Sequence, residues 1–90
     1  MTYRLRVTET AKKELRRLPG YVRQRARHIV NSLAHDPRPS EAKELRDMPG
    51  RYRIRLVKWR VIYRVDDDDQ VVLVLRVRRK TGPETYDGIE

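Results

Sequence analysis

The sequence has no cysteine and only two histidines among its 90 residues. The missing cysteines exclude disulfides, thiolate catalysis and cysteine-based zinc sites. Two histidines without companion ligands do not make a histidine metal site. We therefore expect no metal and no cofactor, and any catalysis must use other side chains.

Long apolar runs are missing as well. The longest apolar segment spans Val71 to Leu75, which is far shorter than the roughly 20 residues of a membrane-spanning helix. The N-terminal segment mixes charges with short apolar pieces and lacks the pattern of a signal peptide. We expect one folded domain covering residues 1–90, located in the cytoplasm and without a membrane partner.

Acidic residues are absent from the two most basic segments, residues 51–65 and 76–80. The chain has 22 Lys and Arg against 13 Asp and Glu, a net charge of +9. The two segments hold 10 of the basic side chains, so the other 70 residues carry 12 basic and 13 acidic ones. A concentrated basic patch implies a polyanionic partner, with nucleic acid favoured over an anionic membrane surface.

Hydrophobic periodicity predicts a strand followed by two helices. Apolar residues alternate with arginines over residues 3–7, as in a half-buried strand. Helical spacing then runs over residues 11–18, with a threonine at 8 or 10 as the cap, and Pro19-Gly20 ends this helix. A second helix is expected from Tyr21 to Asp36, where the following proline stops it. Together they predict a helical hairpin.

Alternation with period 2 returns after a connector at residues 36–50, which can include a short extended piece at 42–45. It predicts antiparallel strands at 51–56 and 60–65, a turn at Asp66 to Asp69, and a last strand at 71–80. In the last strand, one face is expected to hold the apolar residues Val71, Leu73, Leu75 and Val77.

This order predicts an α+β fold: an antiparallel meander that, with the N-terminal strand, makes a sheet of about four strands, with the helical hairpin on its aliphatic face. The opposite face would also hold Ile62, Val72 and Val74, an uncovered apolar patch suited to a partner. The basic side chains would gather on this opposite face: Arg51, Arg53, Arg55, Arg60, Arg64, Arg76, Arg78 and Lys80.

Basic side chains on adjacent strands form a grid with a spacing comparable to that of nucleic-acid phosphates. The alternative is a solvated face that carries arginine for solubility. Like charges opposite one another destabilise a sheet. A grid with no acid in it therefore favours a bound polyanion.

The segments Gly50 to Leu56, Trp59 to Val65 and Leu75 to Lys80, together with Tyr86, resemble the core of the RelE/ParE toxin superfamily. The upstream order of strand, helical hairpin and Leu45 to Pro49 also fits. One branch of this superfamily cleaves messenger RNA on the ribosome, and another inhibits DNA gyrase. The resemblance implies a toxin of a type II toxin–antitoxin system, with an antitoxin protein as its partner.

The resemblance to the RNA-cleaving branch implies a catalytic set. Carried over by position, this set is Arg53, Arg55, Arg60, Lys80 and Tyr86. It implies metal-free attack of a ribose 2′-hydroxyl on the adjacent phosphorus of messenger RNA in the decoding site. We expect the other nearby bases to bind RNA: Arg51, Arg64, Arg76, Arg78 and Arg79.

The chain departs from the family pattern at Arg53 and Arg55, where the best-known pattern has lysines. Guanidinium cannot be deprotonated in a protein, so neither residue can be a general base. That role passes to Tyr86, with Lys80 as the candidate general acid. The alternative for Tyr86 is an aromatic side chain that only packs on the sheet.

Other features and functions stay open at this point. Asp66 to Asp69 is favoured as a solvated turn over a Mg²⁺ site, and His28 and His35 lie away from the basic face. Tyr52 shares its face with Ile54 and is expected in the core. Trp59, at a predicted turn, fits either the core or base stacking. The competing functions are a gyrase-binding toxin and a non-catalytic nucleic-acid-binding module.

Overall fold

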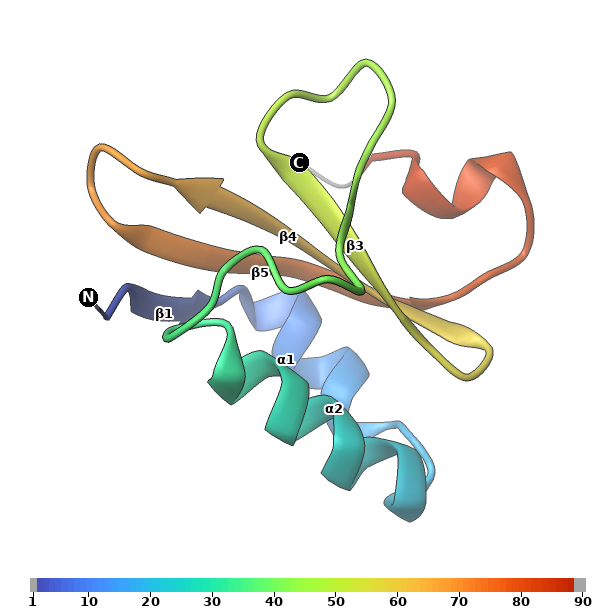
Figure 1. Ribbon diagram of the computed structural model, residues 1–90. Coiled ribbons are helices and arrows are strands. Elements are labelled where there is room, and N and C mark those ends of the chain that lie inside the picture. Colours follow the sequence, from blue (N-terminus) through green and yellow to red (C-terminus); the bar gives the residue numbers. More distant parts are fainter. Residues whose placement is uncertain (1, 89–90) are drawn as a thin grey trace.

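The structural elements form two layers, a pair of helices and a twisted sheet (Figure 1). The computed structural model describes residues 2–88, except for the side chain of Pro83. In chain order the elements are β1 (Arg4–Val7), α1 (Glu9–Arg16), α2 (Gly20–Ser32), β2 (Lys43–Glu44), β3 (Arg51–Leu56), β4 (Trp59–Asp66), β5 (Val71–Arg79) and the 3-10 helix η1 (Pro83–Tyr86).

The sheet of the described chain has five strands in the order β1-β5-β4-β3-β2. Strands β3, β4 and β5 form the predicted antiparallel meander, and β1 lies parallel to β5. The fifth strand, β2, falls within the extended piece expected at 42–45 and pairs with β3 through only two residues. The α+β class is therefore confirmed, with one strand more than the sequence predicted.

The two helices begin close to the predicted positions. The Oγ1 of Thr8 accepts the N–H of Ala11 at 3.1 Å and caps α1, and α2 starts directly after Pro19. The second helix ends at Ser32, earlier than predicted, because the next turn tightens: the N–H of His35 bonds to the carbonyl of Ser32. Neither helix in residues 2–88 has the length and apolar character that crossing a bilayer requires.

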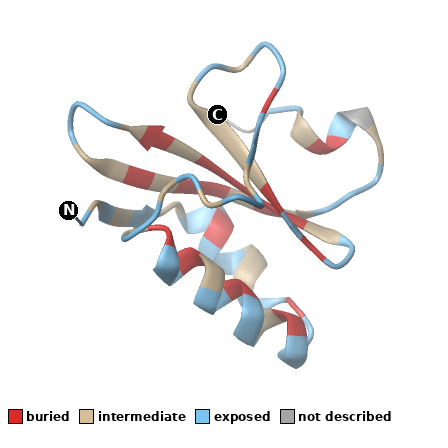
Figure 2. Cartoon of the chain, viewed as in Figure 1, coloured by how far each residue is buried: buried red, intermediate tan, exposed pale blue. Residues whose placement is uncertain are grey.

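The main core lies between the helices and one face of the sheet, as predicted. Buried positions recur at every fourth residue along α2, whereas Ala11 is the buried position within α1 (Figure 2). Removing apolar side chains of this size from water stabilises the fold by about 1.5–3 kcal/mol each. The fully buried members include Val22, Ala26 and Leu33 from the helical layer, and Leu56, Val61, Tyr63, Val72 and Val74 from the sheet.

The face predicted for β5 was wrong for Leu73 and Leu75 and right for Val77. Val72, Val74 and Val77 pack against the helices, whereas Leu73 and Leu75 point to the other side. The register explains the change, because Tyr63 pairs with Val74 and Ile62 pairs with Arg76, which leaves Leu75 as an extra residue. Such a β-bulge reverses the alternation of every residue beyond it. The patch expected from Ile62, Val72 and Val74 therefore does not exist, since only Ile62 lies on the basic side.

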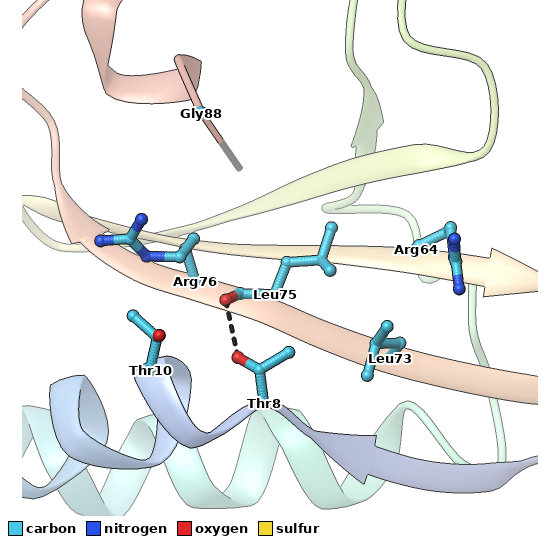
Figure 3. Close-up of a pocket in the computed structure, with 7 residues that line it drawn as sticks. All are labelled: Thr8, Thr10, Arg64, Leu73, Leu75, Arg76 and Gly88. Carbon is cyan, nitrogen blue, oxygen red and sulfur yellow. Dashed lines mark hydrogen bonds between the residues drawn. The ribbon is translucent and has the colours of Figure 1, made fainter. Parts of the chain in front are cut away.

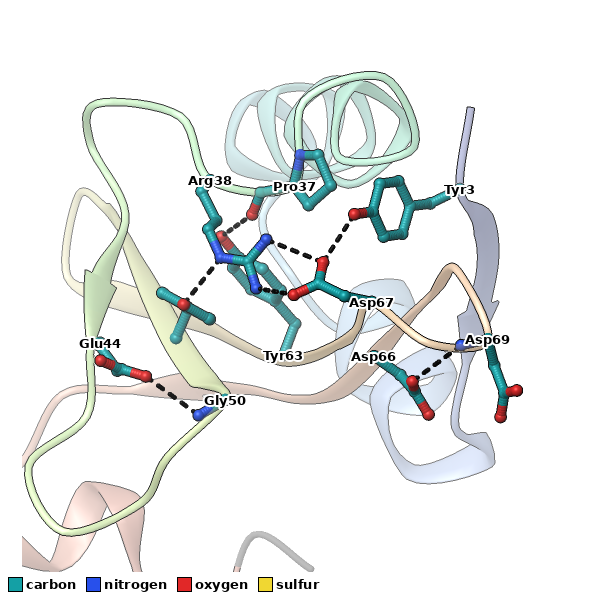
Figure 4. Close-up of polar contacts among 10 residues, drawn as sticks. Tyr3, Pro37, Arg38, Glu44, Gly50, Tyr63, Asp66, Asp67 and Asp69 are labelled. Atoms are coloured by element: carbon teal, nitrogen blue, oxygen red, sulfur yellow. Dashed lines mark hydrogen bonds and ion pairs between the residues drawn. The ribbon is translucent and has the colours of Figure 1, made fainter. Parts of the chain in front are cut away.

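A polar network ties the connector to the β4–β5 turn (Figure 4). Arg38 donates to both carboxylate oxygens of Asp67, at 3.1 and 2.8 Å, and to the hydroxyl of Tyr52 at 2.8 Å. Tyr3 donates to Asp67 at 2.6 Å, and the buried Tyr63 donates to the carbonyl of Pro37 at 2.7 Å. These bonds hold the predicted turn at Asp66 to Asp69 against the N-terminal strand.

The network predicts a pH dependence of stability. The hydrogen bonds from Arg38 and Tyr3 lower the pKa of Asp67. A carboxyl whose pKa is lowered by folding stabilises the native state above its unfolded pKa of about 3.9, and this contribution disappears as the pH falls through the folded value. We expect Asp67→Asn to lower the melting temperature at pH 7, and we expect the difference from wild type to shrink as the pH falls.

Thermal unfolding of both proteins across this pH range is the measurement. Asp68→Asn, which alters an exposed neighbour in the same turn, is the matched control. A difference between wild type and Asp67→Asn that stays constant down to pH 2 would contradict the assignment.

A strained residue lies at the β3–β4 turn. Val57 has φ of 54° and is 42% exposed. A β-branched residue is strained in this left-handed region, which asparagine adopts more easily. We expect Val57→Asn to raise the free energy of unfolding by about 1 kcal/mol, measured by urea denaturation. Val57→Thr keeps the β-branch and should give no gain; an equal gain in both variants would exclude backbone strain as the cause.

Candidate nucleic-acid interface

The sheet face away from the helices carries the predicted basic side chains, and we call it the basic face. The register places Arg51 beside Arg64 in one row, and Arg55 beside Arg60 and Arg78 in another. Between these rows lies a third, in which Arg53 neighbours Ile62. The prediction that bases from three strands converge on one face is therefore confirmed.

The centre of the basic face is apolar. Leu45, Ile62 and Leu75 form a second buried cluster there, and Ile62 is fully buried. Tyr86, carried by the C-terminal tail, packs against this cluster. Its hydroxyl is buried and has no hydrogen-bond partner. The tail thus brings a phenol to the middle of the arginine rows.

Arg60 is the buried member of the predicted catalytic set, with an exposed fraction of 7%. Its Nη1 donates to the carbonyls of Trp59 at 2.8 Å and Val57 at 3.3 Å, and its Nε is buried without a partner. Leaving a buried donor unsatisfied costs about 1–3 kcal/mol. The fold therefore leaves one buried N–H of the guanidinium without an acceptor.

Arg76 has an acidic neighbour that the sequence did not reveal. Its Nε and Nη2 donate to the two carboxylate oxygens of Glu14 at 3.1 and 2.9 Å. Glu14 comes from α1 and also accepts the N–H of Val77 at 2.9 Å. The hydrogen bond to Glu14 raises the pKa of Arg76. Since this guanidinium is engaged by a carboxylate, the grid is not free of acids, and Arg76 is poorly placed to bind RNA.

Arg78 contacts the tail. Its Nη1 donates to the carbonyls of Thr85 at 2.8 Å and Asp87 at 2.6 Å. Arg78 was predicted to bind RNA, but the structure commits this part of its guanidinium to the protein backbone.

The remaining predicted residues lie at the end of β5 and in the tail. Lys80 is exposed, and its backbone N–H donates to the carbonyl of Lys58. The Arg79 guanidinium lies over the ring of Trp59, with 5.9 Å between its Cζ and the ring centroid. Trp59 is partly buried against the helix-side core, which answers the question left open by its sequence position. Tyr52 also packs against that core, as predicted, and its ring stacks on that of Tyr63.

Sequence reasoning missed the extension of the basic face onto β1. Arg4 and Arg6 are exposed and neighbour Val71 and Leu73 of β5. Their alternation with Tyr3, Leu5 and Val7 was the signal that could have found them. Beside this extension is a cavity of about 510 Å³ (Figure 3), in which Leu75 points away from the helices. Its lining is Thr8, Thr10, Arg64, Leu73, Leu75, Arg76 and Gly88.

The candidate metal ligands lie elsewhere. Asp66 accepts the N–H of Asp69 and Asp67 pairs with Arg38, so two of the four aspartates serve the turn. Within residues 2–88 no three His, Cys, Asp or Glu side chains gather as metal ligands would. His28 and His35 are exposed and belong to the helical layer and its exit.

Comparisons with known proteins agree with this architecture. Residues 5–81 match a family model described as the ParE toxin of the type II toxin–antitoxin system parDE. The chain is 36% identical over 88 residues to the mRNA interferase toxin RelE of Escherichia coli strain K12, covering 96% of this chain and 92% of that protein. The chain belongs to the RelE/ParE superfamily of type II toxins.

Solved structures agree at the level of the whole fold. A mutant of E. coli RelE in the free state superimposes with a TM-score of 0.79 at 34% identity, covering 96% of this chain and 92% of that one. The RelE–RelB complex of Pyrococcus horikoshii gives a TM-score of 0.78 at 31% identity, covering 88% of this chain and 96% of that one. The sequence match and the structural matches thus agree that the chain is a RelE-like toxin.

Proposed function

We propose that this toxin is a ribosome-dependent endoribonuclease that cleaves messenger RNA in the decoding site and so inhibits translation in the cytoplasm. The observation that carries the proposal is the basic face itself. It combines rows of arginine, an unpartnered buried donor on Arg60 and a phenol at its centre. The relative in E. coli is named an mRNA interferase, which supports the same reaction for this chain.

The proposed reaction needs no metal. The 2′-oxygen of the ribose forms a bond to the adjacent phosphorus while the bond from phosphorus to the 5′-oxygen breaks, leaving a 2′,3′-cyclic phosphate and a 5′-hydroxyl. Tyr86 orients the 2′-hydroxyl and receives its proton as the general base, and Lys80 donates a proton to the leaving 5′-oxygen. Because RNA supplies the nucleophile, the protein needs mainly to align it and to stabilise charge.

Charge on the non-bridging oxygens is stabilised by guanidinium groups in this scheme. Arg53, Arg55 and Arg60 lie on neighbouring strands, and Arg55 is directly opposite Arg60. Charge-assisted hydrogen bonds from guanidinium to phosphate are among the stronger hydrogen bonds in proteins. None of these groups can accept a proton, which leaves the base role to Tyr86.

We further propose that a cognate antitoxin protein holds the toxin inactive. The similar RelE of P. horikoshii was solved as a complex with RelB, and an intact RelBE toxin–antitoxin complex of E. coli gives a TM-score of 0.76. An antitoxin that lies on the basic face would exclude RNA from it directly.

The match to the ParE family model favours one second candidate, a toxin that binds DNA gyrase without chemistry. Primer extension on a translated message separates the two, with a supercoiling assay run beside it. Cuts at codon-linked positions, made only during translation, support the ribonuclease. Inhibition of supercoiling with intact messages would show instead that the protein is a gyrase-binding toxin. If neither effect is seen, the remaining function is a non-catalytic nucleic-acid-binding module.

A further inference from the structure

The C-terminal tail is anchored to β5 on both sides of Tyr86. The Nη1 of Arg78 is 2.8 Å from the carbonyl oxygen of Thr85 and 2.6 Å from that of Asp87, the two residues that flank Tyr86. One guanidinium nitrogen therefore fixes the backbone immediately before and after the phenol. We call this contact the Arg78 clasp.

Other contacts also fix the backbone of the tail. Thr85 is 2% exposed, and its Oγ1 accepts the N–H of Thr81 at 2.9 Å and of Gly82 at 3.2 Å. Gly82 has φ of 149°, and a Cβ there would come within 2.8 Å of Glu84 Oε2. This conformation is open almost only to glycine. The loop thus has a defined shape, and the side chain it carries onto the basic face is Tyr86.

The loop holds the phenol of Tyr86 in an apolar environment. If packing were its only task, a phenylalanine ring would be more favourable there. Tyr86 lies on Leu45, Ile62 and Leu75, and its buried hydroxyl has no partner. The other buried tyrosine, Tyr63, does have one, the carbonyl of Pro37. A buried hydroxyl without a partner destabilises the fold, and a ligand that displaces the groups covering it can supply the missing partner. A ribose hydroxyl has the required chemistry.

We propose that Arg78 is a positioning residue that holds Tyr86 for the reaction, and that it is not a phosphate-binding residue. The inference rests on the proposed ribonuclease function and deepens it. It assigns to the clasp the placement of the phenol, while binding of messenger RNA depends on the other arginines.

Arg78→Lys is the discriminating variant, because it keeps the positive charge but places its nitrogen one bond closer to the Cα than Nη1, on a stem of different shape, and so draws it back from the two carbonyls of the tail. We expect the rate of cleavage at saturating toxin to fall about 10- to 100-fold, as misplacement by about 1 Å does. The affinity for programmed ribosomes should stay within about twofold of wild type, as expected when only alignment is lost. Arg27→Lys, on the exposed side of α2, is the matched control.

A double-mutant cycle tests whether Arg78 acts through Tyr86. Tyr86→Phe removes the hydroxyl, so adding Arg78→Lys to it should cause no further loss of rate. Losses that multiply, or wild-type cleavage by Arg78→Lys, would overturn the inference and leave the proposed function standing. If the wild-type chain cuts no message, the proposed function is wrong and the inference goes with it.

A second pair of variants covers the case in which Arg78→Lys does not fold. Thr85→Val removes the acceptor of two N–H groups and should reduce the cleavage rate without changing ribosome affinity, whereas Thr85→Ser keeps the hydroxyl and should cleave like wild type. Equal rates for both variants would overturn the tail's positioning role. Faster hydrogen exchange at the amides of Thr81 and Gly82 in Thr85→Val shows directly that the loop has loosened.

Discussion

Tyr86→Phe should lower the rate of message cleavage on the ribosome about 10²- to 10⁴-fold, the usual range for loss of a group that transfers a proton. The structure predicts an unusual companion result. Because the hydroxyl is buried and makes no hydrogen bond, removing it breaks no contact in the fold. The free energy of unfolding should therefore stay the same or rise by up to about 1 kcal/mol.

Two measurements check this prediction. Single-turnover primer extension with saturating toxin gives the rate, and urea denaturation gives the stability. Tyr21→Phe is the matched control, since Tyr21 is 68% exposed on α2, and it should change neither property. Cleavage by Tyr86→Phe at the wild-type rate would show that Tyr86 only packs on the sheet.

Arg53→Gln combined with Arg55→Gln should reduce the cleavage rate by about 10²- to 10³-fold, as expected when donors that stabilise developing charge are removed. Both residues lie on β3 and the register sets Arg55 opposite Arg60. The pair should also weaken binding. If the wild type neutralises about six phosphates, log affinity against log salt has a slope of about −4 to −5, and losing two contacts makes it shallower by about 1.4.

Binding of ribosomes or single-stranded RNA over a range of salt concentrations measures the slope. Arg17→Gln combined with Arg27→Gln removes the same charge from exposed positions of the helical layer. If both pairs change the slope and the rate equally, net charge alone would explain the effect, and the basic face would have no special role.

The sequence predicted what depends on short-range pattern. Alternation in β3 correctly placed Arg53 and Arg55 on the face opposite to that of Ile54 and Leu56. Of the two threonines that the sequence offered as the cap of the first helix, the structure uses Thr8. The same reasoning failed in β5. Alternation holds only while strands stay in register, and nothing in the local sequence around Leu75 announces the bulge.

Contacts that the local sequence pattern does not show explain the other differences. Glu14 neutralises Arg76 from a helix 62 positions earlier in the chain. The Arg78 clasp depends on carbonyl groups of the tail, which every residue has and which no side-chain motif can identify. The sequence thus predicted where the basic face lies, whereas the separate contacts of its arginines became visible only in the folded structure.

The pairing of β1 with β5 also bears on how the toxin is made. The hydroxyl of Thr8 bonds to the carbonyl of Leu75, 67 positions later. Strand β1 must therefore wait until β5 has been synthesised before the two can pair. At about 5–20 residues per second of synthesis, that wait is roughly 3–13 s. Such long-range closure is slow compared with local helix formation. The sheet can therefore be completed only after β5 has been synthesised.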